Sequence, residues 1–206
     1  AVEGSLVLTK SPGRQGGVTL IELMVTVAIV SILLAVGIPQ MGDWIRRNSI
    51  GSAAESVQNG LRRAEAEAIR RNQRVEFFLT NATPSESGIL SLTAADNGKN
   101  WAVRVLGTTD AKLAYVSSFQ MAEVSSAVEL AGPASLFFTG MGRVTDSAGA
   151  AVTDYQVYRL SRSGADRAVC VFVTPGGAIK SCDPALASDK PFACLPLVSL
   201  AKCPKI

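Results

Sequence analysis

The residues from Gly17 to Ile38 read GVTLIELMVTVAIVSILLAVGI, and they decide how the rest of the chain is understood. From Val18 to Ile38 this stretch has 21 residues, and Glu22 is the only ionisable one. At about 1.5 Å per residue, a helix of this length is roughly 30 Å long, which matches the hydrocarbon core of a bilayer. The stretch therefore predicts a helix that spans a membrane.

Two other interpretations of the apolar stretch fit less well. A buried core helix without a polar face would need more protein to cover it than 206 residues provide. A cleaved secretory signal is suggested by Lys10 and Arg14 upstream. The apolar part of such a signal is typically about 7 to 15 residues long, however, and no A-x-A-like cleavage site follows at Pro39.

Two residues in and after the stretch need a physical reason. A carboxylate inside a membrane helix costs about 2.5 to 3.5 kcal/mol, so Glu22 is expected to have a functional partner. Pro39 has no backbone N–H and its ring clashes with the preceding turn, so we expect it to end or kink the helix.

The residues Gly17-Val18-Thr19-Leu20-Ile21-Glu22-Leu23 resemble the prepilin peptidase signature of type IV pilins and type II secretion pseudopilins. The resemblance implies cleavage between Gly17 and Val18, with 1–17 as the leader and Val18 as an N-methylated first residue. Counted from Val18, the acid is the fifth residue and Pro39 the twenty-second, where the family keeps Glu and a helix-kinking Pro. The family usually has Phe or Met where this chain has Val18.

The resemblance also implies partners and a location. Glu22 would pair with the N-terminal amine of a neighbouring subunit during filament assembly. The partners would be prepilin peptidase, other major and minor pilins or pseudopilins, and an inner-membrane assembly platform. The subunit would cross the inner membrane once, with its C-terminal domain in the periplasm, before it enters a filament at the cell surface. Because the tip-most subunit usually lacks the acid, Glu22 suggests a place below the tip.

The sequence after Pro39 predicts a long helix followed by a β domain. Apolar residues recur every three or four positions, as in an amphipathic helix, at Ile50, Ala54, Val57, Leu61, Ala64 and Ala68. After Asn72 the period changes to two, which predicts strands at 75–80, 88–92, 100–106, 112–118, 125–130, 134–140, 154–160, 167–173 and 177–181. The expected fold is α+β and pilin-like, with a helix over 18–74, transmembrane over 18–38, packed on an antiparallel β-sheet domain over 75–206.

The second half of the chain resembles one branch of this superfamily. The segments AAESVQNGLRRAEAEAIRRNQRV, LFFTGMGRV and VCVFVTPGGAIKSC are similar to the GspH/FimT family of minor pilins and pseudopilins. Some members bind DNA through a Gly-Arg-x-Arg hairpin, which here becomes Gly177-Ala178-Ile179-Lys180. The planar guanidinium groups are lost, so DNA is a possible but disfavoured partner. The remaining candidate contacts are Arg159, Arg162, Arg167 and Lys180.

Four cysteines lie in the last fifth of the chain, at Cys170, Cys182, Cys194 and Cys203. In a domain outside the cytoplasm they predict two disulfides, with three possible connectivities. A three-residue hairpin loop at Pro175-Gly176-Gly177 would place Cys170 opposite Cys182, which favours the pairs Cys170–Cys182 and Cys194–Cys203. A zinc site is disfavoured because there is no C-x-x-C pair and no histidine.

The composition argues against an enzyme. The absence of histidine excludes imidazole acid–base chemistry, catalytic triads that use histidine and histidine-ligated metals. The net charge of +3 is lower than that of a dedicated nucleic-acid binder. We therefore expect no catalytic residue, cofactor or metal. The alternatives that remain are a type IV pilus minor pilin, a type II secretion pseudopilin, a DNA-binding minor pilin and a plain membrane-anchored β domain.

Overall fold

The computed structural model describes residues 17–205, apart from the side chains of Pro39 and Gln40. The chain divides after Met41 into two units, Ala1–Met41 and Gly42–Ile206, and each is described by itself. The described part of the first unit shows no core, since every residue in 17–38 is exposed. In the described part of the chain, all buried residues lie between Ser49 and Cys203. The unit Gly42–Ile206, called the head below, therefore contains the whole core formed by the described residues, so we expect it to fold without the first unit.

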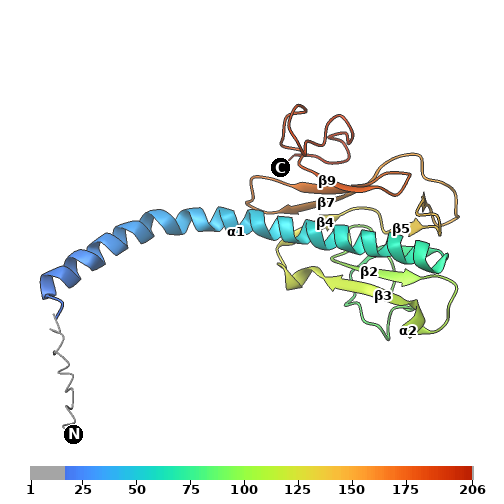
Figure 1. Ribbon diagram of the computed structural model, residues 1–206, viewed down its shortest axis with the longest axis horizontal. Coiled ribbons are helices and arrows are strands. Elements are labelled where there is room, and N and C mark those ends of the chain that lie inside the picture. Colours follow the sequence, from blue (N-terminus) through green and yellow to red (C-terminus); the bar gives the residue numbers. More distant parts are fainter. Residues whose placement is uncertain (1–16, 206) are drawn as a thin grey trace, which may run out of the picture. The chain divides into compact units, whose positions relative to one another are not determined.

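Helix α1 runs without interruption from Leu20 to Arg71 (Figure 1). Its residues Leu20–Ile38 are long and apolar enough to cross a membrane, as the sequence predicts. The helix continues through Pro39, as the predicted helix over 18–74 requires, so this proline does not end it. A proline inside a helix removes one backbone hydrogen bond, and the following residues can still continue the helix.

The head contains two antiparallel sheets. The first has the strand order β3-β2-β1-β5-β6 and the second the order β4-β7-β8-β9. In the first sheet the strands are β1 (Val75–Thr80), β2 (Asn100–Val105), β3 (Tyr115–Gln120), β5 (Ser135–Phe138) and β6 (Val144–Thr145). In the second they are β4 (Val128–Ala131), β7 (Gln156–Arg162), β8 (Val169–Val173) and β9 (Ile179–Cys182). Two short helices, α2 (Ala111–Ala114) and η1 (Met121–Glu123), flank β3.

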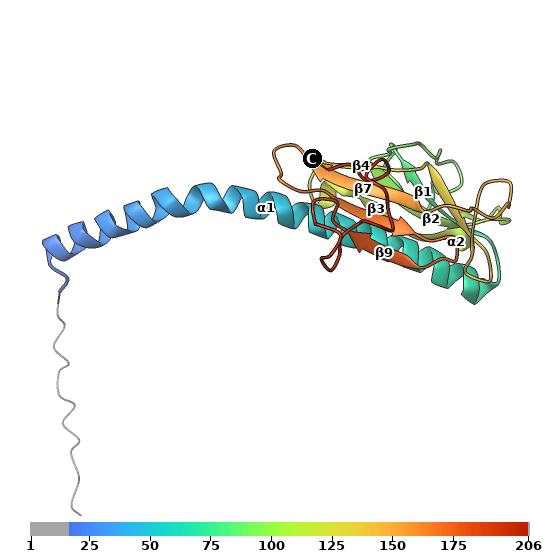
Figure 2. The same ribbon diagram turned by 90° about the horizontal axis from the view of Figure 1, so that it is seen from above.

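One core joins the two sheets to the second half of α1 (Figure 2). The predicted apolar stripe is confirmed, because all six of its residues are buried against side chains of both sheets. The helix approaches the first sheet closely at Gly60, where an added Cβ would lie 2.8 Å from the ring of Trp101. A larger residue at position 60 would therefore force the helix and sheet apart.

One predicted strand is wrong, and another begins later than predicted. Residues 88–92 form turns, and Ile89 is buried in a small cluster with Phe78 and Ala102. Residues 111–114 form helix α2, because the side chain of Asp110 accepts hydrogen bonds from the backbone N–H groups of Lys112 and Leu113. Such an aspartate satisfies amides at a helix start and favours helix over strand. The strand expected over 112–118 therefore begins only at Tyr115.

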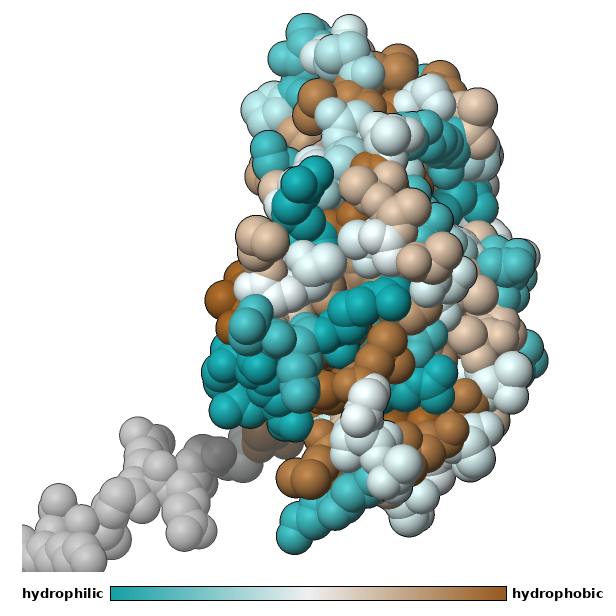
Figure 3. All heavy atoms as spheres, turned by 90° about the vertical axis from the view of Figure 1, so that its right-hand side faces the viewer, coloured by the Kyte–Doolittle hydropathy of each residue, from teal (hydrophilic) through white to brown (hydrophobic). Residues whose placement is uncertain are grey.

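The end of the head at which α1 finishes has a mixed surface. Hydrophobic and hydrophilic residues are interspersed on this face (Figure 3). Glu67 binds two arginines here: Arg70 Nε at 2.8 Å and Nη2 at 2.6 Å, and Arg71 through its Nε. These hydrogen bonds lower the pKa of Glu67 from its ordinary value of 4.5 to about 2, and the bond from Arg70 makes the largest contribution.

Glu67 is expected to make the head less stable in acid. A carboxylate with a lowered pKa stabilises the fold above its unfolded pKa, and this contribution is lost as the pH falls through its folded pKa. For Glu67 the loss falls between about pH 4.5 and about pH 2. Glu67→Gln should lower the free energy of unfolding at pH 7 by about 1 kcal/mol. It should also flatten the pH dependence in that window.

Urea unfolding of residues 42–206 at a series of pH values measures this effect. Parallel stability curves for the native head and the Glu67→Gln variant between pH 4.5 and pH 2 would contradict the assignment.

Candidate functional site

The residues around the expected cleavage position precede the helix. Gly17 and Val18 lie outside α1, and both are exposed. An added Cβ on Gly17 would meet no atom within 4 Å. Of the predicted leader, residues 1–16 lie outside the described part of the chain. The Gly17–Val18 bond thus lies in an accessible segment outside the helix.

Thr19 caps the start of α1. Its Oγ1 accepts a hydrogen bond from the backbone N–H of Glu22 at 3.3 Å, and its carbonyl accepts one from Leu23 at 3.1 Å. This is the side-chain bond of a capping box, Thr-x-x-Glu, which satisfies an amide that has no partner inside the helix. The expectations from sequence did not include this role for Thr19, although the spacing of Thr19 and Glu22 signals it.

Glu22 is exposed on the first turn of α1, among exposed apolar side chains such as Ile21 and Leu23. None of the salt bridges found within residues 17–205 involves its carboxylate. The described part of the subunit therefore supplies no cation for this acid. A carboxylate inside an apolar layer is costly without a cation, so in a membrane Glu22 would need a cation from outside the described part of its own chain.

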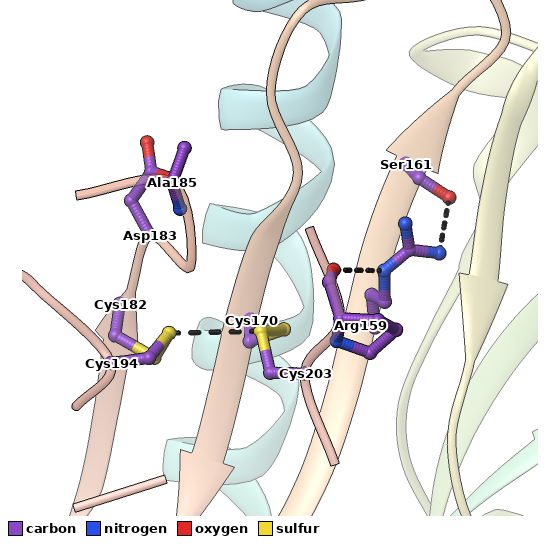
Figure 4. The surroundings of a disulfide bond; sticks show 9 residues. Arg159, Ser161, Cys170, Cys182, Asp183, Ala185, Cys194 and Cys203 are labelled. Carbon is purple, nitrogen blue, oxygen red and sulfur yellow. Dashed lines mark hydrogen bonds between the residues drawn. A yellow bond between two sulfur atoms is a disulfide. The ribbon is translucent and has the colours of Figure 1, made fainter. Parts of the chain in front are cut away.

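All four cysteines form disulfides, as predicted, but the predicted pairing is wrong. Cys170 bonds Cys203, and Cys182 bonds Cys194 (Figure 4). The predicted register is confirmed, since Cys170 lies directly opposite Cys182 on β8 and β9. Residues directly opposite in an antiparallel pair have Cβ atoms about 4.5 to 5.5 Å apart, farther than the roughly 3.8 Å of a disulfide.

The tail after β9 accounts for the observed pairing. It returns over the outer face of β8 and β9, where each strand cysteine bonds one tail cysteine. The two bridges touch, since Cys194 Sγ and Cys203 Sγ are 3.6 Å apart. Arg159 also fastens the tail, by donating from Nε to the carbonyl of Pro204 at 3.1 Å (Figure 4). The tail is thus part of the head's second hydrophobic cluster.

The structure does not bring the four candidate DNA contacts together. Arg159 and Lys180 lie on the outer face of the second sheet, under or beside the tail. Arg162 points to the opposite face, where its Nη1 donates to Ser49 Oγ of α1 at 2.9 Å. Arg167 Nε lies 3.6 Å from a carboxylate oxygen of Asp183. Three of the four side chains therefore already contact groups of the head.

The sequence of this chain matches known families and proteins over most of its length. Residues 53–177 match the family model described as type II transport protein GspH, and residues 12–38 match the prokaryotic N-terminal methylation motif. A fimbrial protein of Pseudomonas aeruginosa is 32% identical over 108 residues, which cover 50% of this chain and 68% of that protein. The type IV major fimbrial protein FimA of Dichelobacter nodosus (strain VCS1703A) is 37% identical over 100 residues, covering 48% and 57%.

Two solved structures are also similar. The type IV minor pilin FimU of Pseudomonas aeruginosa has 16% identity and a TM-score of 0.48, and the match covers 73% of this chain and 98% of that one. The minor pseudopilin EpsH from the Type 2 Secretion System of Vibrio cholerae has 14% identity and a TM-score of 0.45, covering 67% and 99%.

An apolar N-terminal helix with a methylation motif, followed by an antiparallel β head, defines the class of type IV pilins and pseudopilins. These features fit a membrane-anchored subunit that contacts other pilins. Within the class, the chain belongs to the GspH family, whose model matches more than half of its residues.

Proposed function

We propose that this protein is a minor pilin that is incorporated into a type IV pilus, where it helps to initiate or connect filament assembly. It acts through hydrophobic packing and charge pairing, without catalysis, metal or cofactor. The observation that carries the proposal is Glu22, a lone carboxylate on an exposed apolar helix, at the fifth position after Gly17. The similarity to fimbrial proteins favours a pilus.

The proposed sequence of events begins in the inner membrane, with the head in the periplasm. Prepilin peptidase cuts after Gly17, and the new amine of Val18 is methylated. An assembly platform then brings subunits together, and Glu22 of one subunit binds the Val18 amine of its neighbour. Because Glu22 lies four residues after Val18, this pairing fixes the register between adjacent helices. An ion pair buried in this way is better at fixing register than at adding stability.

A second candidate is a pseudopilin of a type II secretion system, which the description of the matching family favours. Both candidates require the same processing and the same ion pair. They differ in the filament that contains the protein. Loss of pili on deletion of the gene, with normal secretion of folded enzymes, supports the pilus, and the reverse result supports the secretion system.

The mature N-terminus tests the processing step common to both candidates. Mass spectrometry of the protein from native membranes should find Val18 as the first residue, carrying one methyl group. A Gly17→Leu variant should retain the leader, because the peptidase cuts after a small residue, while Gly16→Leu serves as the neighbouring control. Recovery of the native protein with residues 1–17 still attached would contradict the proposal.

A further inference from the structure

The sulfurs of the two disulfides lie in one cluster on the outer face of the second sheet (Figure 4). Cys182 Sγ, Cys194 Sγ and Cys203 Sγ all lie within 4.8 Å of one another, and Cys203 is bonded to Cys170. None of the four residues is more than 4% exposed. In the reduced chain, the same fold would therefore place four buried thiols together.

The spacing of these sulfurs is close to that of a tetrahedral metal site. Four thiolates at about 2.3 Å from Zn²⁺, at the corners of a tetrahedron, have sulfurs roughly 3.8 Å apart. Cys194 Sγ and Cys203 Sγ, which belong to different bridges, are 3.6 Å apart. Because the four ligands come from two strands and a returning tail, they have no C-x-x-C spacing in the sequence. The spacing argument against zinc therefore does not apply to the folded head.

Two cations on the same face of the sheet can compensate the charge of such a site. Zinc with four thiolates is an anion, because the thiolate charges exceed that of the metal. Arg159 on β7 lies directly opposite Cys170 on β8. Lys180 precedes Cys182 on β9 by two positions, which places both on the same face. Neighbouring cations favour the thiolate over the thiol, and metal binding requires the thiolate.

The tail has few other contacts that could hold it in the reduced chain. Among the described residues, the hydrophobic cluster beneath it contains only Phe172 and Val198 as buried side chains besides the four cysteines. A metal ion bound by two thiolates of the strands and two of the tail would replace both covalent links.

We propose that the reduced chain binds Zn²⁺ through Cys170, Cys182, Cys194 and Cys203, and that this ion holds the tail on the sheet until the disulfides form. The two thiolates of each bridge then pass an electron pair to the disulfide of an oxidising thiol–disulfide oxidoreductase, which takes up protons from water and leaves as a dithiol. Zinc is released, because the sulfurs of a disulfide are no longer thiolate ligands. The site belongs to the subunit before oxidation, so its failure would leave the proposed filament role intact.

Cobalt(II) is the probe for this site, because its tetrahedral thiolate complexes absorb strongly in the visible and near-ultraviolet. The full chain in detergent, reduced with a phosphine, should bind one Co²⁺ and show thiolate-to-cobalt charge transfer. Added Zn²⁺ should displace the cobalt and bleach these bands. The oxidised chain should show neither band, since its cysteines are all bridged.

Variants separate ligation from other effects. Cys203→Ser should weaken Co²⁺ binding by more than about 100-fold, the upper end for losing a group that only supports a ligand. Ser199→Ala, in the same tail, is the matched control and should bind like the native chain. Lys180→Gln should cause a smaller loss that fades at high salt, because an exposed charge is screened.

Hydrogen exchange in the tail gives a second readout. The backbone N–H of Val198 donates to the carbonyl of Cys194 at 2.8 Å, and its exchange should slow when zinc is added to the reduced chain. An octahedral cobalt spectrum, equal binding by the oxidised chain, equal affinity of Cys203→Ser and the native chain, or exchange at Val198 that zinc does not change would each overturn the inference.

Discussion

Replacing Glu22 by alanine is expected to remove almost all of the subunit from sheared filaments while its level in the membrane stays unchanged. The neighbour's amine would then lie unpaired among apolar helices. An uncompensated charge inside an apolar layer costs about 2.5 to 3.5 kcal/mol, which corresponds to roughly a 60- to 300-fold loss at equilibrium. Immunoblots of sheared filaments and of membranes measure the two pools.

Charge rather than shape should decide this result. Glu22→Gln keeps the size of the side chain and loses the charge, so it should fail like alanine, whereas Glu22→Asp should be incorporated in part. Glu55→Ala changes an exposed acid of the same helix within the head and serves as the control. Normal amounts of Glu22→Ala in filaments would favour a plain membrane-anchored β domain.

Replacing Arg104 by alanine should strongly destabilise the head. Arg104 Nε donates to Glu76 Oε2 at 2.7 Å, and the Glu76 side chain is only 5% exposed. Removing one partner of a buried ion pair leaves the other charge uncompensated and typically costs 3 to 5 kcal/mol. Urea unfolding of residues 42–206 should show this loss, at about 3 to 5 kcal/mol.

Two comparisons separate the buried charge from other effects. The double variant Glu76→Gln with Arg104→Leu removes both charges, so it should be more stable than Arg104→Ala alone. Arg70→Ala removes an arginine that is 66% exposed and should cost less than about 1 kcal/mol. If Arg104→Ala and the double variant lose the same free energy of unfolding, the uncompensated charge of Glu76 is not the cause of the loss.

Arg104 also explains why a loop is ordered. Its Nη1 donates to the carbonyls of Ile89 and Leu92 at 3.1 Å each, and its guanidinium lies 4.5 Å from the centre of the Phe78 ring. The loop between β1 and β2 thereby covers the outer face of the first sheet and buries Glu76. In the sequence VEFFLT, Glu76 has the place of an ordinary outward-facing strand residue.

The parts of the fold predicted from sequence are those that depend on local periodicity. The apolar stripe of α1, the membrane span and the register of Cys170 and Cys182 all follow from spacing along one element or one hairpin. The burial of Glu76 and the pairing of the cysteines depend on where the loop and the tail return over the sheets. The paths of this loop and this tail depend on contacts between residues far apart in the chain, and the local spacing of apolar residues does not predict such contacts.

The site divides in the same way. The sequence predicts Gly17 and Glu22 as site residues because their spacing is fixed along one segment. The arrangement of the basic residues depends on how the strands fold, so spacing alone does not predict it. Successive side chains of β7 point to alternate faces of the sheet, so Arg159 and Arg162 lie on opposite faces. The number of positive charges in the sequence gives no information on this. The capping role of Thr19 also depends on spacing along one segment, because Thr-x-x-Glu is the pattern of a capping box.

The cap at Thr19 has an electrostatic consequence for the processed subunit. Aligned peptide dipoles give the start of a helix about half a positive elementary charge. Cleavage after Gly17 would create a cationic amine on Val18, directly before the cap, where it faces this like-signed end of its own helix. A solitary processed subunit would carry that repulsion. In the proposed filament, binding of this amine to the acid of an adjacent helix would compensate its charge, so the removal of a repulsion within each subunit would add to the attraction between subunits.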